Sequence, residues 1–111
     1  MSNDYPREGE LQRIKDWDVI GGNLQDFISY LESIWHLPEW GFRVHRGREH
    51  LFKRWCMKLE LHTGGWSGND ANEDIIGTLQ QNYFWTLFWQ KSVRGGHYYF
   101  EFPIDRWRRN A

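Results

Sequence analysis

The residues with the clearest chemical potential lie in two glycine-rich segments in the second half of the chain. One follows an expected strand and precedes an expected helix, and it contains Gly64, Gly65, Trp66, Ser67, Gly68 and Asn69. The other is Arg94-Gly95-Gly96, directly before His97. A glycine loop between a strand and a helix can bind phosphate, because its backbone N–H groups and the helix dipole point at the anion. The first loop, with Arg94 and His97 nearby, is therefore a candidate site for a small ligand or a nucleotide.

Two departures weaken this phosphate-binding hypothesis. The loop lacks the lysine and hydroxyl residue of a Walker loop, and its glycine spacing differs from the dinucleotide fingerprint. Carboxylates also crowd the start of the following helix and repel an anion there. These acidic residues are Asp70, Glu73 and Asp74. A structural turn is therefore favoured, and ligand binding remains the alternative hypothesis.

Three histidines and two glutamates are expected on one face of a sheet. His45, His62 and His97 fall on the polar side of three predicted strands, as do Glu60 and Glu101. Imidazole and carboxylate groups that converge can hold a metal ion or exchange protons. No HExxH or comparable ligand spacing is present, so ordinary surface histidines are favoured and we expect neither metal nor cofactor.

Cys56 is the only cysteine, which excludes an internal disulfide and a multi-cysteine zinc site. Its thiol could pair with His62 or His45. A lone cysteine on a strand, without an oxyanion-hole motif or helix N-terminus beside it, is however a poor candidate nucleophile. We therefore expect a protein without enzymatic activity.

A short basic strip runs from Arg43 to Lys58 and is interleaved with Trp40, Phe52 and Trp55. In outline it resembles a nucleic-acid face. The rest of the chain is acidic, and the net charge of −1 removes the bulk attraction that a general nucleic-acid binder carries. Nucleic acid is therefore an unlikely partner, and weak nucleic-acid binding is the third hypothesis.

Aromatic residues dominate the composition. They make up 18% of the chain and include eight tryptophans, although the mean hydropathy is only −0.80. Large rings can fill a small core, and they are also enriched at protein interfaces. The 111 residues predict one domain over 1–111. No apolar run approaches the ~18 residues of a membrane span, and no hydrophobic leader follows Met1, so a cytoplasmic location is expected.

The first half of the chain predicts a loose N-terminal arm, a helix and two strands. Residues 1–10 lack periodicity, and Leu11, Ile14 and Trp17 are expected to pin the next turn to the body. Asn23 is a suitable helix cap, and Pro38 ends the helix. The apolar stripe of that helix is Leu24, Phe27, Ile28, Leu31, Ile34 and Trp35.

The two strands have alternating patterns and are joined by a hairpin turn over 47–50. The inward residues are Trp40, Phe42 and Val44 on the first strand and Trp55, Met57, Leu59 and Leu61 on the second.

The second half predicts one long helix and an edge strand. The helix spans 70–91, with an apolar stripe of Ile75, Ile76, Leu79, Tyr83 and Leu87. Its later turns carry four further rings on the other side, which need another cover. These are Phe84, Trp85, Phe88 and Trp89. In the last strand Tyr98, Phe100, Phe102 and Ile104 face inward, and Pro103 favours an edge position. A short basic tail follows.

The order helix, strand, strand, helix, strand predicts an α+β fold: a three-stranded antiparallel sheet with two helices packed on one face. The other face is expected to be open to water. It would carry Arg43, His45, Lys58, Glu60, His62, His97, Tyr99 and Glu101.

Two short motif strings carry a resemblance to known proteins. The run His62 to Asn69, the pairs Phe84-Trp85 and Phe88-Trp89, and the stretch from Arg94 to Tyr98 are similar to a motif set in small uncharacterised proteins of phages and prophages. The resemblance covers residues 58–102 and implies no activity, cofactor or catalytic residue. Separately, residues 37–41 resemble a short piece of the barstar-like inhibitors, but the helix that follows in those proteins is missing here.

Together these observations favour a non-catalytic protein of phage or mobile-element origin that binds another protein. It would act as an inhibitor of a host defence or nuclease system in the host cytoplasm. Rings that exceed the needs of a small core are the main support. The alternatives are that a homodimer covers them or that they fill the core of this domain itself. The expected contact residues are Trp66, Phe84, Trp85, Phe88 and Trp89.

Overall fold

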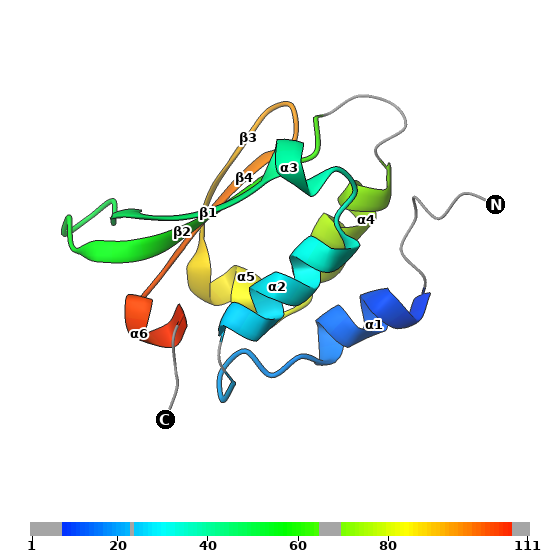
Figure 1. The fold of residues 1–111 in the computed structure, drawn as a ribbon, viewed down its shortest axis with the longest axis horizontal. Coiled ribbons are helices and arrows are strands. Elements are labelled where there is room, and N and C mark those ends of the chain that lie inside the picture. The colour runs from blue at the N-terminus through cyan, green and yellow to red at the C-terminus, as the bar shows by residue number, and fades with distance from the viewer. Residues whose placement is uncertain (1–7, 23, 65–69, 108–111) are drawn as a thin grey trace.

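The computed structural model describes residues 8–22, 24–64 and 70–107, and within them it shows an α+β fold of six helices and four strands (Figure 1). In chain order these are α1 (Glu8–Asp16), α2 (Leu24–Ile34), α3 (Pro38–Gly41), β1 (Phe42–Arg48), β2 (Trp55–His62), α4 (Asp70–Leu79), α5 (Tyr83–Phe88), β3 (Trp89–Val93), β4 (His97–Phe102) and α6 (Ile104–Trp107). None of these helices is long and apolar enough to span a membrane.

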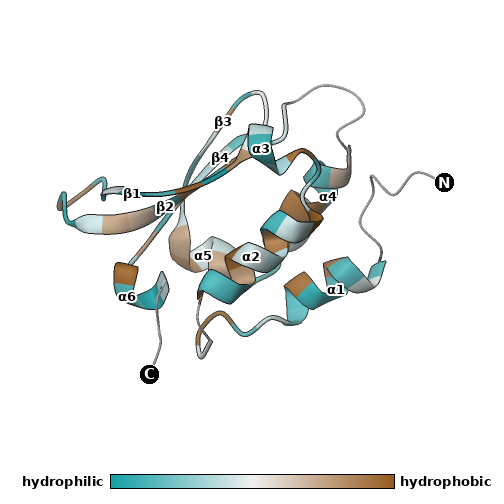
Figure 2. Ribbon diagram, viewed as in Figure 1, coloured by the Kyte–Doolittle hydropathy of each residue, from teal (hydrophilic) through white to brown (hydrophobic). Residues whose placement is uncertain are grey.

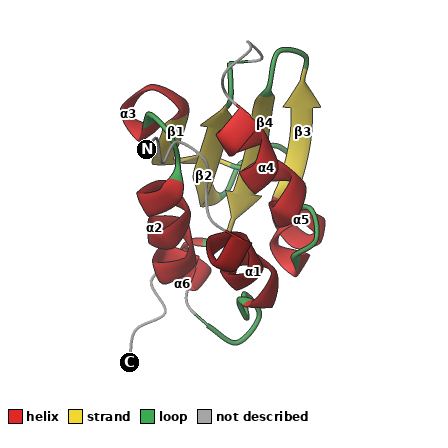
Figure 3. Cartoon of the chain, turned by 90° about the vertical axis from the view of Figure 1, so that its right-hand side faces the viewer, coloured by secondary structure: helices red, strands yellow, loops and turns green. Residues whose placement is uncertain are grey.

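The sheet is antiparallel and has the strand order β1-β2-β4-β3. Helices α1, α2, α4 and α5 lie on one side of it, and no helix of the described ranges covers the other side (Figures 1 and 3). The predictions of an α+β fold and an antiparallel sheet are confirmed, but the predictions of three strands and of two helices are wrong. The additional strand, β3, occupies the edge position. β4 is therefore internal, and Pro103 lies just beyond its end rather than on an edge strand.

The predicted long helix over 70–91 is instead two short helices and a strand. Asn82 causes the break: its side-chain oxygen accepts a hydrogen bond from Phe84 N at 2.7 Å, which caps α5. Its Nδ2 donates to Ile14 O at 2.8 Å and to Trp17 O at 3.0 Å. An asparagine that caps one helix and also bonds a distant loop cannot continue the preceding helix.

The N-terminal segment is more ordered than its composition predicts. Residues 8–10 belong to α1 rather than to a loose arm, while residues 1–7 lie outside the described residues. Ile14 is fully buried, and Leu11 and Trp17 pack against the core, as expected. Tyr30 donates a hydrogen bond from its hydroxyl to Glu10 O at 3.0 Å, which ties α1 to α2.

The core lies between the helices and the covered face of the sheet. The predicted stripe of α2 is confirmed, and Figure 2 shows apolar and polar segments alternating along this helix. The predicted cap of α2, Asn23, lies outside the described residues. Phe84 is the centre of the aromatic packing, with ring centroids 5.4 Å from Phe27, 5.3 Å from Phe88 and 5.2 Å from Phe100.

The β1–β2 hairpin differs from its prediction at both ends. β1 begins at Phe42, because Trp40 belongs to α3 and is exposed. The strands extend to Arg48 and resume at Trp55, so the connection spans 49–54 rather than 47–50. Trp55, predicted inward, is also exposed, and Cys56, predicted outward, is buried. The hairpin runs out beyond the helices in Figure 1, so the face that is core elsewhere is uncovered at this end.

The chain after β4 turns back onto the body. Ile104, predicted as the last inward strand residue, begins α6 instead. Trp107 packs on Phe102 at 5.8 Å between ring centroids, and Arg106 donates to Val19 O and, at 3.2 Å, to Ile20 O. The described part of the predicted basic tail is therefore attached to the domain, and residues 108–111 lie outside the described residues.

Candidate functional site

The open face of the sheet brings together the polar side chains that the strand patterns predicted. Register places Arg43, Glu60 and Tyr99 in one row across β1, β2 and β4, and His62 beside His97 in another. A third row contains His45, Lys58 and Glu101. Opposed residues in an antiparallel sheet share a face. The prediction that these eight groups share one surface is therefore confirmed.

Glu60 is the centre of this surface. Its Oε2 lies 2.7 Å from His45 Nε2, and its Oε1 lies 3.3 Å from His62 Nε2 and 3.9 Å from Arg43 Nη1. Burial by itself raises the pKa of Glu60, but the hydrogen bonds from the two histidines, with the Arg43 charge nearby, outweigh it and hold the pKa below its ordinary value. Glu60 is therefore a carboxylate at neutral pH.

The hydrogen bonds of the histidines constrain their protons. His62 and His97 face each other with their Nδ1 atoms 2.8 Å apart, so one ring donates and the other accepts. When His62 Nε2 donates to Glu60, a neutral His62 accepts at Nδ1 from His97. His45 contacts two acceptors, Glu60 and, at 3.2 Å, Arg46 O, so both bonds form together only when its ring is doubly protonated. The result is a continuous hydrogen-bonded chain from His45 through Glu60 and His62 to His97.

A depression of about 430 Å³ adjoins this chain. Its lining residues include His45, His50, Lys58, Glu60, Gln90, Lys91, Tyr99 and Glu101. Lys58 Nζ lies 3.2 Å from Glu101 Oε2, and Lys91 Nζ lies 4.9 Å from the centre of the Tyr99 ring. The depression suits a small polar ligand that forms hydrogen bonds with the charged side chains of its lining. Within the described ranges, no group of three or more His, Cys, Asp or Glu side chains is arranged to hold a metal ion.

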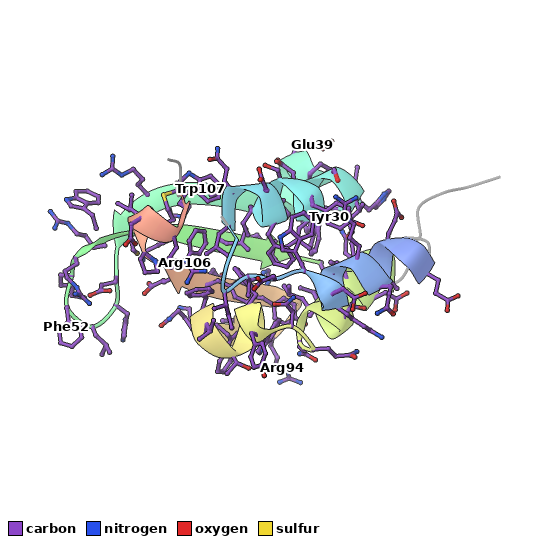
Figure 4. The ribbon with its side chains drawn as sticks, turned by 90° about the horizontal axis from the view of Figure 1, so that it is seen from below. Tyr30, Glu39, Phe52, Arg94, Arg106 and Trp107 are labelled. Atoms are coloured by element: carbon purple, nitrogen blue, oxygen red, sulfur yellow. The ribbon has the colours of Figure 1, made fainter. Side chains whose placement is uncertain are left out.

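The predicted glycine-loop site is described only in part. Gly65, Ser67, Gly68 and Asn69 lie outside the described residues, as does Trp66. Gly64 has a φ of 90°, and its neighbour Thr63 donates a backbone hydrogen bond to Gly96 O at 2.8 Å, so the two glycine segments adjoin. Of the other predicted ligand residues, Arg94 is exposed in the β3–β4 turn (Figure 4). His97 ends the hydrogen-bonded chain that begins at His45.

Cys56 is poorly placed for nucleophilic catalysis. The residue is buried, and burial, with the Glu101 carboxylate nearby, raises the pKa of its thiol. The thiolate is the reactive form, so a buried thiol with a raised pKa is a weak nucleophile.

Of the five aromatic residues predicted as protein contacts, Trp66 lies outside the described residues, and the other four separate into core and surface. Phe84 and Phe88 are buried and belong to the core, because the break at Asn82 changes the phase of the second helix. Trp85 is half-buried, and Trp89 is exposed at the start of β3. A partner would therefore contact Trp89 and its neighbours rather than the two phenylalanines.

The same change of phase exposes residues that the sequence pattern placed inside. Tyr83 is 68% exposed and Leu87 is 50% exposed on α5, and Trp89 at 43% and Val93 at 44% are exposed on β3. Trp89 pairs with Phe100 on the covered face and Val93 with His97 on the open face, so these two side chains flank the β3 edge from opposite sides of the sheet. We call these four residues the edge patch. Its Trp89 indole is fixed by a hydrogen bond from Nε1 to Ser92 Oγ at 2.9 Å. The pattern analysis missed Tyr83 and Leu87, and a cap signal at Asn82 was the clue that could have revealed them.

Comparison with protein-family models, with curated proteins and with solved structures finds no match to this chain.

Proposed function

We propose that this protein is a non-catalytic binding protein that recognises another protein through β3 and the edge patch. The observation that carries the proposal is the state of β3, in which all five residues are exposed. Within the described part of the chain β3 pairs only with β4. Its second edge therefore presents backbone N–H and C=O groups that a strand of another protein can pair with.

The edge patch supplies apolar contact area beside that strand. Trp89 is held by Ser92 and by the neighbouring Trp85 ring, so little side-chain freedom is lost when a partner covers it. A fixed, half-exposed tryptophan is typical of an interface hot spot. Strand pairing and a tryptophan anchor together favour a protein partner over a small ligand at this surface.

Charge favours a different protein over a second copy of this chain. Lys91 lies in the middle of β3, so an antiparallel pairing of two β3 strands centred there would oppose two lysines. Like charges directly opposite each other destabilise a strand pair, and lysine on an edge strand is a common protection against self-pairing. A partner strand with an acidic residue opposite Lys91 would avoid this repulsion and gain attraction.

The resemblance to phage and prophage proteins supports a host protein as the partner. In that setting the chain would act in the host cytoplasm as an inhibitor of a defence or nuclease system. It would inhibit its partner by covering part of the partner's surface, because the proposed contact consists of backbone pairing and apolar burial and includes no chemical step.

The experiment compares tagged wild-type protein with Val93→Lys and Leu87→Lys as baits in host lysate. Ile20→Lys is the control, because Ile20 is also well exposed, at 56%, but lies in the α1–α2 connection. We expect wild type and Ile20→Lys to capture the same protein, and both edge-patch variants to lose it. Light scattering tests the alternative that β3 pairs with a second copy of this chain. A wild-type dimer that becomes a monomer in Val93→Lys would support this homodimer and contradict a foreign partner.

A second candidate function is binding of a small polar ligand on the open face. The specific observation is the hydrogen-bonded chain from His45 through Glu60 and His62 to His97 beside the 430 Å³ depression. A thermal-shift screen of nucleotides, amino acids and sugars tests it, since a ligand that binds the folded state raises the melting temperature. A shift that disappears in His97→Ala would support the site, and a shift retained in this variant would move the ligand elsewhere.

A further inference from the structure

The connection between β1 and β2, with the adjoining strand ends, forms a basic and aromatic projection. We call residues 46–55 the hairpin arm; it has the sequence Arg-Gly-Arg-Glu-His-Leu-Phe-Lys-Arg-Trp. Figure 1 shows this end of the hairpin extending beyond the helices, and Figure 4 places Phe52 at its outer end, away from the body. Neither the core nor the proposed protein contact uses these residues.

The arm continues the covered face of the sheet past the point where the helices end. Register opposes Arg46 to Met57 and Arg48 to Trp55, so these four side chains share the face that is core further along the strands. Met57 is still buried, whereas Trp55 is 53% exposed. The apolar face is therefore replaced, beyond Met57, by guanidinium groups and an open indole ring.

Arginines lie directly over the exposed rings. The Arg48 guanidinium carbon is 4.1 Å from the Trp55 ring centre, and that of Arg46 is 5.6 Å from it. Arg54 lies 5.2 Å from the centre of the Phe52 ring, which is 71% exposed. These cation–π contacts keep the guanidinium planes beside the rings, so charge and stacking surface are presented together.

The positive charge of the arm is largely uncompensated. Its four bases face one acid, Glu49, which pairs with Arg54 at 2.8 Å. Among the described residues, Arg46, Arg48 and Lys53 form no ion pair with a carboxylate. Within the described ranges these three cations therefore have no carboxylate partner, although Arg48 Nη1 donates a hydrogen bond to Lys53 O at 3.1 Å.

We infer that the hairpin arm binds single-stranded nucleic acid, with unpaired bases stacked on Phe52 and Trp55 and phosphates bound by Arg46, Arg48 and Lys53. Aromatic rings beside a basic track are the common device for binding single strands, because every base has a face that can stack. Arginine suits this role better than lysine, since its planar group binds phosphate through two donors and also stacks. Duplex bases are already stacked on each other and would leave the rings unused.

The remaining charge of the molecule limits the contact to the arm. The whole chain has a net charge of −1, so the residues outside the arm are acidic overall and repel a polyanion. An anionic membrane is a less suitable partner, because a bilayer would meet the tip at Leu51 and Phe52 and leave the strand residues Arg46 and Trp55 behind it.

The test is fluorescence anisotropy with labelled oligo(dT) and oligo(U) of about 20 nucleotides, longer than the ~4–16 nucleotides that a single module covers. We expect affinity to fall with salt between about 50 mM and 200 mM, with a log–log slope of about −2 for three phosphate contacts. Phe52→Ala and Trp55→Ala should each weaken binding about tenfold. Leu51→Ala is the matched control, because it removes an exposed apolar group without a ring from the same turn.

Binding of either oligo(dT) or oligo(U), with the expected salt dependence and the expected loss in Phe52→Ala and Trp55→Ala, supports the inference. Absence of binding at about 50 mM salt overturns it, as does equal affinity for a duplex of the same length. Equal binding by Phe52→Ala, Trp55→Ala and wild type would reduce the contact to charge alone and also overturn it. Capture by anionic phosphatidylserine vesicles, with no binding to oligonucleotides, would assign the arm to a membrane surface instead. Far-UV circular dichroism of each variant establishes that it is folded.

Discussion

Trp89 lies nearly parallel to Trp85, with ring centroids 6.3 Å apart and ring planes at 13°. Trp85 in turn meets Phe100 edge-on at 5.2 Å. Phe100 is buried and Trp89 is exposed, so the three rings form a continuous series of contacts from the core to the surface. The edge patch is therefore supported by the core, which gives its central tryptophan a defined position before any partner binds.

This arrangement predicts different costs for the two tryptophans. Trp85→Ala removes a ring that contacts the core and should lower the free energy of unfolding by about 2–4 kcal/mol. Trp89→Ala removes an exposed ring and should lower it by less than about 1 kcal/mol. Urea unfolding of both variants measures the difference. Equal losses would show that Trp89 is a structural residue and would remove the reason to assign it to an interface.

Asn82 is expected to be among the most sensitive polar residues. Asn82→Ala removes the α5 cap and both hydrogen bonds to the α1 end, and should cost about 2–3 kcal/mol. Asn82→Asp keeps the capping acceptor but loses the donor, so part of the loss should remain. Thermal unfolding beside exposed Gln81→Ala as a control gives the comparison. Full stability of Asn82→Ala would contradict the role given to this side chain.

Asn82 also explains why the local sequence pattern mispredicted residues 70–91. The stripe of α2 and the alternation in β2 and β4 were readable because each is a local period on a single face. The helix over 70–91 was mispredicted because its break depends on hydrogen bonds to Ile14 and Trp17, more than sixty residues earlier. No window around Asn82 contains these partners, so the capping preference of asparagine was the only local clue to the break that creates β3 and the edge patch.

The polar open face was predictable for the opposite reason. Alternation assigns each strand residue to one of two faces, so the shared surface followed from three strands alone. The hydrogen bonds within it needed the strand order that places His62 beside His97. The prediction that Trp55 is buried was wrong, because alternation identifies the face of a strand residue but does not show how far the helices extend over that face.

Glu60 predicts a pH dependence of stability. Its folded-state pKa is lowered from 4.5, so its contribution is present above that value and is lost as the pH falls through the lowered pKa. Glu60→Gln should therefore cost about 1 kcal/mol at pH about 7 and progressively less at pH about 3. Urea unfolding of both proteins at the two pH values measures this, with Glu39→Gln, on the exposed side of α3, as the control. A cost that is the same at both values would contradict the carboxylate role.

Two glycines predict opposite effects of the same substitution. A Cβ at Gly41 would lie 2.2 Å from His62 O, a backbone atom that cannot move without disturbing β2. Gly41→Ala should therefore destabilise the fold by more than about 2 kcal/mol. Gly77 lies in α4 with nothing within 4 Å of an added Cβ, so Gly77→Ala should stabilise by about 0.5–1 kcal/mol. Melting temperatures that move in the same direction would contradict the packing of α3 against β2.

The most direct test of the central claim is amide hydrogen exchange of the protein alone and in the purified complex with the captured partner. If a partner strand pairs with β3, the exposed-edge amides among residues 89–93 should become protected, while the amides of the hairpin arm should exchange as before. Protection confined to the open face or to the hairpin arm, with β3 unchanged, would contradict recognition through the sheet edge.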